Sequence, residues 1–413
     1  MIGVYIHIPF CVKKCNYCDF LSFPCQEELR GRYVDALVRE IKNFNHNDME
    51  VATVFFGGGT PSILSCDEIE KIMAALGEHL HLSNDAEITM ECNPGTVNRN
   101  KLNRIRELGI NRLSIGLQSC RDSELKLLGR IHDYEDFLEC FWMARDVGFD
   151  NINVDIMSAL PGQSVESYLD TLTNVVNIKP EHVSAYSLII EENTPFYSIY
   201  GNDTSVELGN IAGSVRENSD NDYSQCPECN PKLNNYPSLP GEDDERRMYY
   251  LTEKVLGENG YHRYEISNYA RDGYECRHNT TYWTGGEYVG FGLGASSYIN
   301  NVRFRNEEDI NEYISHIHEK GVCGHAEEIK LTEMDNIEEF MITGLRLMRG
   351  ISKREFKSRF GKSIEYYYGE VLTSLINEGL IEEEGDGIRL TKYGIDVSNY
   401  VLSFFLFDKD YIK

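Results

Sequence analysis

Along about the first 200 residues, short apolar runs typical of strands alternate with longer amphipathic stretches. The runs are GVYIHI, VATVFF, AEITMEC, RLSIGLQ, NINVDIM and HVSAYSLII. Helical periodicity lies between them, over about 27 to 44, from Asp67, near Lys101, from Tyr134 and from Ser164. Repeated strand and helix units predict a parallel sheet covered by helices, so we expect an α/β fold.

The segment 201–240 breaks this pattern. It is rich in Asn, Ser, Asp, Gly and Pro, which predicts a mobile surface insertion. It contains CPEC, with Cys226 and Cys229, a spacing that suits half of a zinc site or a redox pair. No second pair of this kind lies near it in the sequence, so its role stays unassigned.

The C-terminal part has a different organisation. The helical patterns IEEFMITGLRLM, KREFKSRFG and YYGEVLTSLINEGL are followed by a short β-like pair, IEEEG and IRLTKYG. Three helices and a hairpin predict a small winged-helix-like domain over 328–413. We expect residues 1–300 to contain the main α/β domain and a further segment that follows it in the chain.

Charge and the N-terminus narrow the class of protein. The formal net charge is -27, which would repel a nucleic-acid backbone and an anionic membrane surface. We therefore expect no nucleic-acid partner. MIGVYIHIPF lacks the basic start and apolar region of a signal peptide, and no apolar run has the length of a membrane span. A cytoplasmic location is the expectation.

The cysteines supply the first candidate chemistry. Twelve cysteines in a reducing compartment favour metal ligands, redox thiols or core residues over disulfides. CVKKCNYC places Cys11, Cys15 and Cys18 in one loop after the first strand, where they can meet on one inorganic cluster. A four-iron cluster takes four ligands, so three thiols leave one iron open to a small chelating molecule. The alternative is a zinc knuckle completed by His7 or a distant cysteine.

Other polar or glycine-rich groups follow the next strands. GGGT, residues 57–60, follows the second strand, and Glu91 ends the third. The carboxyl ends of parallel strands lie at one rim, and functional residues gather there. Glycines lack a Cβ and leave N–H groups exposed to a ligand. The sequence therefore predicts one site at this rim, beside the cysteine loop.

Several motifs together resemble the oxygen-independent coproporphyrinogen III oxidase family, and more closely its haem-chaperone branch. They cover most of the chain outside 201–240 and are YIHIPFCVKKCNYCDF, GGGTPS, MECNPGT, RLSIGLQS, LGRIH, NINVDIMSALPGQ, YHRYEISNYA and CRHNTTYW. The resemblance implies a partial (β/α)6 TIM-like radical S-adenosylmethionine (SAM) barrel that opens toward a substrate or haem surface. It also implies a winged-helix-like C-terminal domain.

The resemblance further implies a [4Fe-4S] cluster on Cys11, Cys15 and Cys18, with SAM chelated to the open iron. An electron from the cluster would cleave SAM to a 5'-deoxyadenosyl radical, so the cofactor carries the difficult step. In the family, the segment of Gly58, Gly59 and Thr60 binds the methionine amino group. The other implied SAM-site residues are Tyr5, Tyr17, Glu91, Gln118, Arg130 and Asp155. Arg130 is suited to pair with the methionine carboxylate.

HNxxYW, formed by His278, Asn279, Tyr282 and Trp283, resembles the segment that holds haem in the chaperone branch. Neutral imidazole is a good iron ligand, and aromatic side chains can cover a porphyrin face. Without the resemblance, Tyr282 and Trp283 would be interpreted as core aromatics and His278 as a loop cap. Cys276 is a further candidate ligand or a small buried residue.

Phe20 decides between the two branches. Members of the oxidase branch usually carry another cysteine two residues after the third cluster cysteine, where this chain has Phe20. We therefore predict a haem chaperone with haem as cargo, which delivers haem to respiratory or other haem-accepting proteins. Its cluster needs a reductant, and only a partner would draw it transiently to a membrane.

Two alternatives remain open. An oxygen-independent coproporphyrinogen III oxidase, an oxidoreductase of porphyrin biosynthesis, would use the same SAM site to decarboxylate propionate side chains. A tRNA-modifying radical SAM enzyme is suggested by the winged-helix-like tail, but the charge of -27 disfavours it. Whether the protein is an enzyme depends on this choice.

Overall fold

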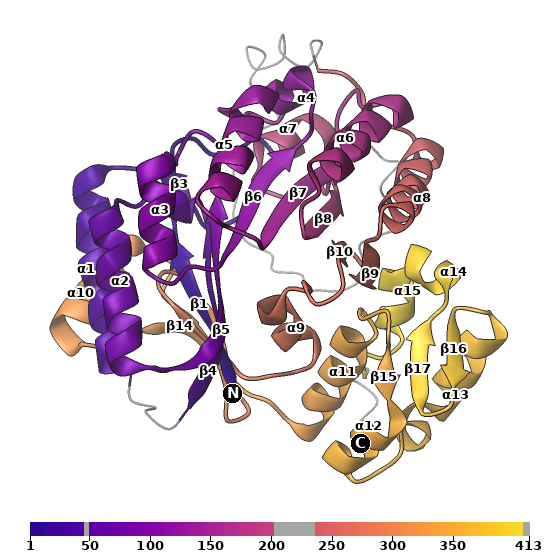
Figure 1. Ribbon diagram of the computed structural model, residues 1–413. Coiled ribbons are helices and arrows are strands. Elements are labelled where there is room, and N and C mark those ends of the chain that lie inside the picture. The colour runs from indigo at the N-terminus through magenta and orange to yellow at the C-terminus, as the bar shows by residue number, and fades with distance from the viewer. Residues whose placement is uncertain (45–48, 202–235, 408–413) are drawn as a thin grey trace, which may run out of the picture.

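The structure is a computed structural model that describes residues 1–44, 49–201 and 236–407 (Figure 1). Cys226 and Cys229, with most of the predicted insertion, lie outside the described residues.

A sheet of 12 strands forms the centre of the molecule, in the order β14-β13-β12-β11-β1-β4-β5-β6-β7-β8-β10-β9. Six consecutive strands within it are parallel: β1 (Ile2–Ile8), β4 (Glu50–Gly58), β5 (His81–Cys92), β6 (Arg112–Gln118), β7 (Ile152–Ser158) and β8 (His182–Ser187). In β1, Val4, Ile6 and Ile8 are fully buried, and Tyr5 and His7 alternate with them and line the interior cavity. Each strand therefore contributes one face to the core and one to the interior.

Helices connect successive parallel strands and cover the outer face of the sheet, as Figure 1 shows. They are α1 (Glu27–Asn43), α2 (Cys66–His79), α3 (Arg99–Glu107), α5 (Tyr134–Asp146) and α6 (Val165–Ile178). Polar caps determine where several of these helices begin. At α2, for example, Ser65 and Glu68 form a capping box. Six parallel strands with these crossovers confirm the predicted partial (β/α)6 barrel.

Additional strands extend the sheet on both sides, and the sequence patterns did not predict most of them. β11 (Tyr288–Phe291) pairs in parallel with β1. The remaining edge strands are antiparallel: β12 (Ser296–Ile299), β13 (Val302–Asn306), β14 (His325–Lys330), β10 (Asn268–Ala270) and β9 (His262–Glu265). Four more helices accompany the sheet: α4 (Asp122–Leu127), α7 (Pro195–Tyr200), α8 (Glu242–Glu258) and α10 (Ile310–Lys320). A short helix, α9 (Arg277–Trp283), lies between the barrel and the C-terminal part.

The C-terminal part has its own small sheet and hydrophobic cluster. Its elements are α11 (Glu333–Gly344), β15 (Ile351–Ser352), α12 (Lys353–Phe360), α13 (Ile364–Asn377), β16 (Ile381–Glu384), β17 (Gly387–Leu390), α14 (Lys392–Asp396) and α15 (Ser398–Ser403). The predicted three helices and hairpin are present, followed by two further short helices. An ion pair joins this part to the barrel, from the partly exposed Arg346 to the buried Glu265 at 2.6 Å.

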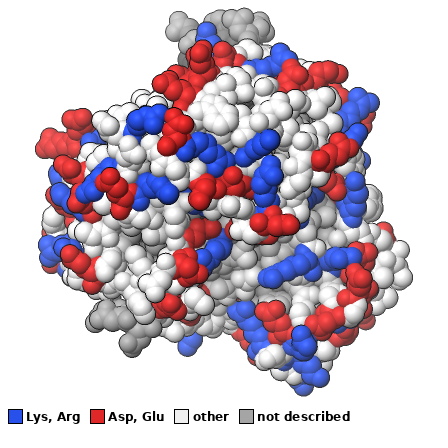
Figure 2. Space-filling model, viewed as in Figure 1, with Lys and Arg blue, Asp and Glu red and all other residues white. Residues whose placement is uncertain are grey.

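The surface carries both signs of charge. On the face shown in Figure 2, Lys and Arg are interspersed with Asp and Glu. Among the described helices, none combines the length and apolar character required to cross a membrane.

Candidate cofactor site

The cysteine loop is fixed at its base and at its tip. β2 (Phe10–Cys11) and β3 (Phe23–Pro24) pair in parallel and close the base. At the tip, Asn16 donates from its backbone N–H and from Nδ2 to the carbonyls of Leu128 and Leu127, at 2.9 and 2.8 Å. His7 Nε2 lies 2.9 Å from the Leu21 carbonyl oxygen, so His7 supports the loop.

All three predicted cluster cysteines line one cavity of about 140 Å³ at the carboxyl ends of the strands. Thr60 Oγ1 donates to Cys11 Sγ at 3.5 Å, and Arg130 Nη1 donates to Cys15 Sγ at 3.8 Å. Burial raises the pKa of the Cys18 thiol to about 11, whereas ligation to iron holds a thiol as thiolate. Three thiols around one cavity, with donors to two of them, fit a [4Fe-4S] cluster with an open iron.

The zinc alternative lacks support among the described residues. No group of three or more His, Cys, Asp or Glu side chains in them is arranged for a single metal ion. Of the two candidates for its fourth ligand, a distant cysteine or His7, His7 has Nε2 on the Leu21 carbonyl and Nδ1 at 3.1 Å from the Tyr5 hydroxyl. An iron–sulfur cluster does not need all three thiols around one metal ion, because each of its irons binds a separate thiol.

The GGGT segment lies beside this loop, but two of its N–H groups are not exposed as expected. The N–H groups of Gly59 and Thr60 donate to the carbonyls of Ile8 and Phe10, each at 2.8 Å, so they are not available to a ligand. A Cβ on Gly58 (φ +109°) would lie 2.5 Å from His7 Cε1, and one on Gly59 would lie 2.8 Å from the Phe10 carbonyl. The glycines let β4 approach β1 directly behind the cysteine loop.

Glu91 and Asp155 form a carboxylate pair on the cavity wall. Burial, and then the charge of Asp155, raise the pKa of Glu91 to about 8, although the Gly58 N–H donates to this carboxylate. Burial also raises the pKa of Asp155, which accepts from Ser114 Oγ at 3.2 Å and from Asn153 Nδ2 at 2.7 Å. Burial and the neighbouring carboxylate therefore favour the protonated form of Glu91 in the free protein.

Arg130 and Gln118 meet near Gly116. Arg130 Nη2 donates to Asn93 Oδ1 at 2.6 Å and to the Gly116 carbonyl at 3.0 Å. A Cβ on Gly116 would lie 3.0 Å from Gln118 Nε2, so glycine leaves room for both side chains. Gln118 itself adopts a φ of +70°, a strained conformation that is common at ligand sites.

Asn93 is a site residue that the sequence analysis missed. It lies in MECNPGT, two residues after Glu91, and its Nδ2 donates to Thr60 Oγ1 at 2.8 Å. Asn93 therefore links the GGGT segment, through Thr60, to Arg130. Its position in the motif MECNPGT is the sequence signal that could have identified it.

A larger cavity of about 950 Å³ lies next to the cluster loop. Tyr5, Tyr17 and Phe20 line it beside Cys18, and the Phe20 side chain is 59% exposed. His278, Asn279 and Tyr282 of α9 also line it. The structure thus places most of the predicted SAM and haem residues around one connected space.

His278 is buried, and both of its ring nitrogens have partners. Nδ1 lies 2.8 Å from Thr53 Oγ1, and Nε2 lies 2.7 Å from the Tyr282 hydroxyl. Burial, and then the charge of Arg112, lower the pKa of His278 to about 3. The imidazole is therefore neutral, and it can ligate iron only if one of these hydrogen bonds breaks.

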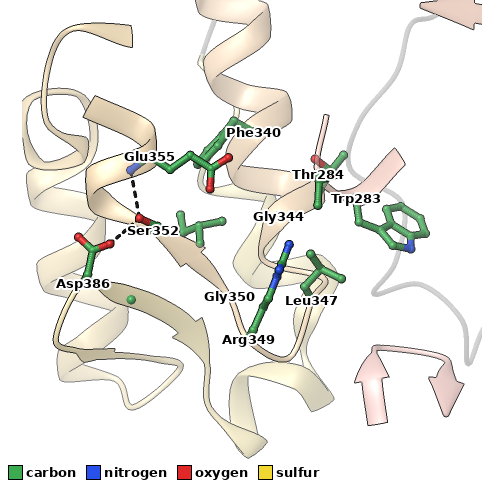
Figure 3. Close-up of a pocket in the computed structure, with 13 residues that line it drawn as sticks. Trp283, Thr284, Phe340, Gly344, Leu347, Arg349, Gly350, Ser352, Glu355 and Asp386 are labelled. Carbon is green, nitrogen blue, oxygen red and sulfur yellow. Dashed lines mark hydrogen bonds between the residues drawn. The ribbon is translucent and has the colours of Figure 1, made fainter. Parts of the chain in front are cut away.

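Trp283 is separated from the other residues of HNxxYW. It does not line the 950 Å³ cavity; it lines cavities of about 250 and 430 Å³ between α9 and the C-terminal part. Figure 3 shows the first of these, with Trp283 and Thr284 on one side and Ser352, Glu355 and Asp386 on the other. The Arg346 guanidinium lies 4.6 Å from the centre of the indole ring. Trp283 is better placed to hold this junction than to touch a ligand of the main cavity.

Replacing Glu91 by Gln should reduce the dependence of stability on pH. A carboxyl whose pKa rises from 4.5 unfolded to about 8 folded stabilises fully below pH 4.5, and this contribution is lost as pH rises through 8. The thermal midpoint of cofactor-free Glu91→Gln should thus fall less than that of the wild type between about pH 5 and about pH 9. The exposed Glu78→Gln is the control. Equal pH profiles for wild type and Glu91→Gln would contradict this assignment.

Comparisons with known proteins find relatives that match nearly the whole chain. Residues 5–175 match the Radical SAM superfamily, and residues 331–397 match the HemN C-terminal domain. Heme chaperone HemW of Bacillus subtilis is 34% identical over 409 residues, which cover 98% of this chain and 99% of that protein. Heme chaperone HemW of Escherichia coli is 32% identical, with 98% of each chain covered.

A solved structure shows the same fold. Coproporphyrinogen III oxidase (HemN) from Escherichia coli, a radical SAM enzyme, superposes with a TM-score of 0.79 at 24% identity. The match covers 98% of this chain and 89% of that one. Both the barrel and the C-terminal part are therefore common to the two proteins.

Proposed function

Since the chain belongs to the HemW family of radical SAM proteins, we propose that it is a haem chaperone, which binds haem and transfers it to haem-dependent proteins such as respiratory ones. The observation that carries this proposal is identity of 32–34% to heme chaperones HemW over nearly the full length of both chains. Phe20, which lies at the cavity beside Cys18, also supports it, because the oxidase branch usually has a cysteine at this position.

Cys11, Cys15 and Cys18 would hold the cluster, which with SAM supplies one-electron chemistry when bound. Glu91, Gln118, Arg130 and Asp155 line the cavity that the thiols share and would orient SAM. Arg130 supplies the positive charge for the methionine carboxylate. Tyr17, whose ring is packed beside Arg130, would cover the cluster from water.

Haem would occupy the larger cavity, where Tyr5, Phe55, Tyr186, Tyr282 and Tyr288 offer aromatic surface. His278, neutral and at the wall of this cavity, is the proposed iron ligand. Ligation through Nε2 requires the Tyr282 hydroxyl to move away.

Haem titration of three proteins tests this proposal. His278→Ala should weaken haem binding and change the Soret spectrum, because the axial ligand is removed. Tyr282→Phe should bind haem at least as tightly as the wild type, because Nε2 no longer has a competing partner. Wild-type protein that binds haem no better than an unrelated acidic protein would rule the proposal out.

The oxidase alternative is tested by anaerobic incubation of the reconstituted protein with SAM, a strong reductant and coproporphyrinogen III. We expect no protoporphyrinogen by mass spectrometry. Repeated turnover would make the protein an oxidase despite Phe20, and the fold shared with HemN makes this assay necessary.

A further inference from the structure

Arg112 is a buried cation without a partner. It is the first residue of β6 and lines the 950 Å³ cavity, and its side chain is only 2% exposed. Its guanidinium forms no hydrogen bond or ion pair with any of the described residues, and Nε is buried without an acceptor. Thr89 pairs with Arg112 across the sheet, and its buried Oγ1 also lacks a partner.

A buried guanidinium without a hydrogen-bond acceptor lowers the stability of a protein that has no ligand bound. Buried polar groups are nearly always hydrogen-bonded, and a buried charge needs a partner. Arginine presents five N–H donors in a planar fork that matches a carboxylate. An acceptor supplied from the cavity would satisfy Arg112.

The acidic residues around Arg112 are engaged elsewhere. Glu87 accepts from the backbone N–H groups of His278 and Arg277, at 3.1 and 3.2 Å. Asp155 accepts from Ser114 and Asn153. Both acids stabilise the charge of Arg112 from a distance, but neither hydrogen-bonds to its donors.

Charge also favours Arg112 as the anchor of an anionic ligand. Only two Lys or Arg side chains line the cavity within the described chain, Arg112 and Arg305. Arg305 pairs with Glu308 at 2.6 Å. In a protein of net charge -27, a ligand that carries carboxylates therefore meets in this cavity one cation whose donors lack an acceptor, Arg112.

We propose that Arg112 binds a propionate carboxylate of the tetrapyrrole held in this cavity, with the Thr89 hydroxyl alongside. The identity of the ligand rests on the proposed function. The carboxylate is distinct from that of SAM, because Arg112 and Gln118 lie at opposite ends of β6, about 20 Å apart at six residues of strand. Arg130 and Arg112 thus bind two different carboxylates at two levels of one barrel.

Binding of haem and haem dimethyl ester to the full-length protein tests this site. The wild type should bind the free acid at least about tenfold more tightly than the ester, and Arg112→Gln should lose this preference. Arg112→Lys, which keeps the charge but not the fork, should retain part of it. Arg99→Gln removes the same charge from an exposed position and should keep the full preference.

Each outcome decides a separate claim. A wild type that binds haem without discriminating against the ester, or an Arg112→Gln protein that still discriminates, overturns the role of Arg112 and leaves the haem chaperone intact. A wild type that binds neither form overturns the proposed function itself. If Arg112→Gln does not fold, the wild-type and Arg112→Lys titrations still decide. Coproporphyrin III is the second probe; if its binding depends on Arg112 and haem binding does not, haem is the wrong tetrapyrrole.

Discussion

Cys15→Ser should retain almost no iron–sulfur cluster after anaerobic reconstitution, whereas Cys25→Ser should retain it fully. Cys15 lines the same cavity as the other two thiols and lies beside Arg130, so its loss leaves two ligands for a cluster that already has one open iron. Serine is a poor replacement because its hydroxyl is not ionised as a thiolate is. The readouts are iron and sulfide per chain and the visible absorbance of the cluster.

Cys25 is a matched control for this prediction. It lies at the base of the same loop, where its backbone N–H donates to the Cys11 carbonyl, but its thiol accepts from Arg30 and does not line the cavity. Full cluster content in Cys15→Ser, or equal loss in Cys25→Ser, would contradict the assignment of Cys11, Cys15 and Cys18 as the ligands.

The barrel could be predicted from sequence because its signals are local. Each parallel strand is six or more residues long with apolar side chains recurring along it, and polar caps such as Ser65 and Asp133 mark helix starts. The edge strands escaped prediction because β11 and β12 have only four residues each and depend on pairing with β1 and β13. α9 has no side-chain cap; distant Glu87 receives its first N–H groups.

The candidate site was predictable in outline because strand ends share a rim. The cysteine loop, Glu91, Gln118 and Arg130 meet there, as the βα order implied. The expectation of exposed N–H groups in GGGT was wrong, because those of Gly59 and Thr60 donate to the carbonyls of Ile8 and Phe10, far away in the sequence. The contact of this segment with SAM stays a prediction. Trp283 separates from Tyr282 because consecutive helical residues point about 100° apart.

Gly58→Ala should lower the free energy of unfolding by about 2–4 kcal/mol, the range for backbone strain combined with overpacking. Alanine at φ +109° is strained, and its Cβ would lie 2.5 Å from the His7 ring. That ring cannot easily move, since its nitrogens bond to the Leu21 carbonyl and the Tyr5 hydroxyl. Displacing it would also loosen the cysteine loop, so cluster content should fall together with stability.

Gly31→Ala tests whether this effect comes from the site and not from loss of a glycine. Gly31 lies within α1, and a Cβ added there would meet nothing within 4 Å, so alanine should stabilise the protein by up to about 1 kcal/mol. Urea unfolding of the three cofactor-free proteins measures both changes. An unfolding free energy for Gly58→Ala equal to that of the wild type would show that His7 yields, and that the tight contact between β1 and β4 does not hold the cysteine loop.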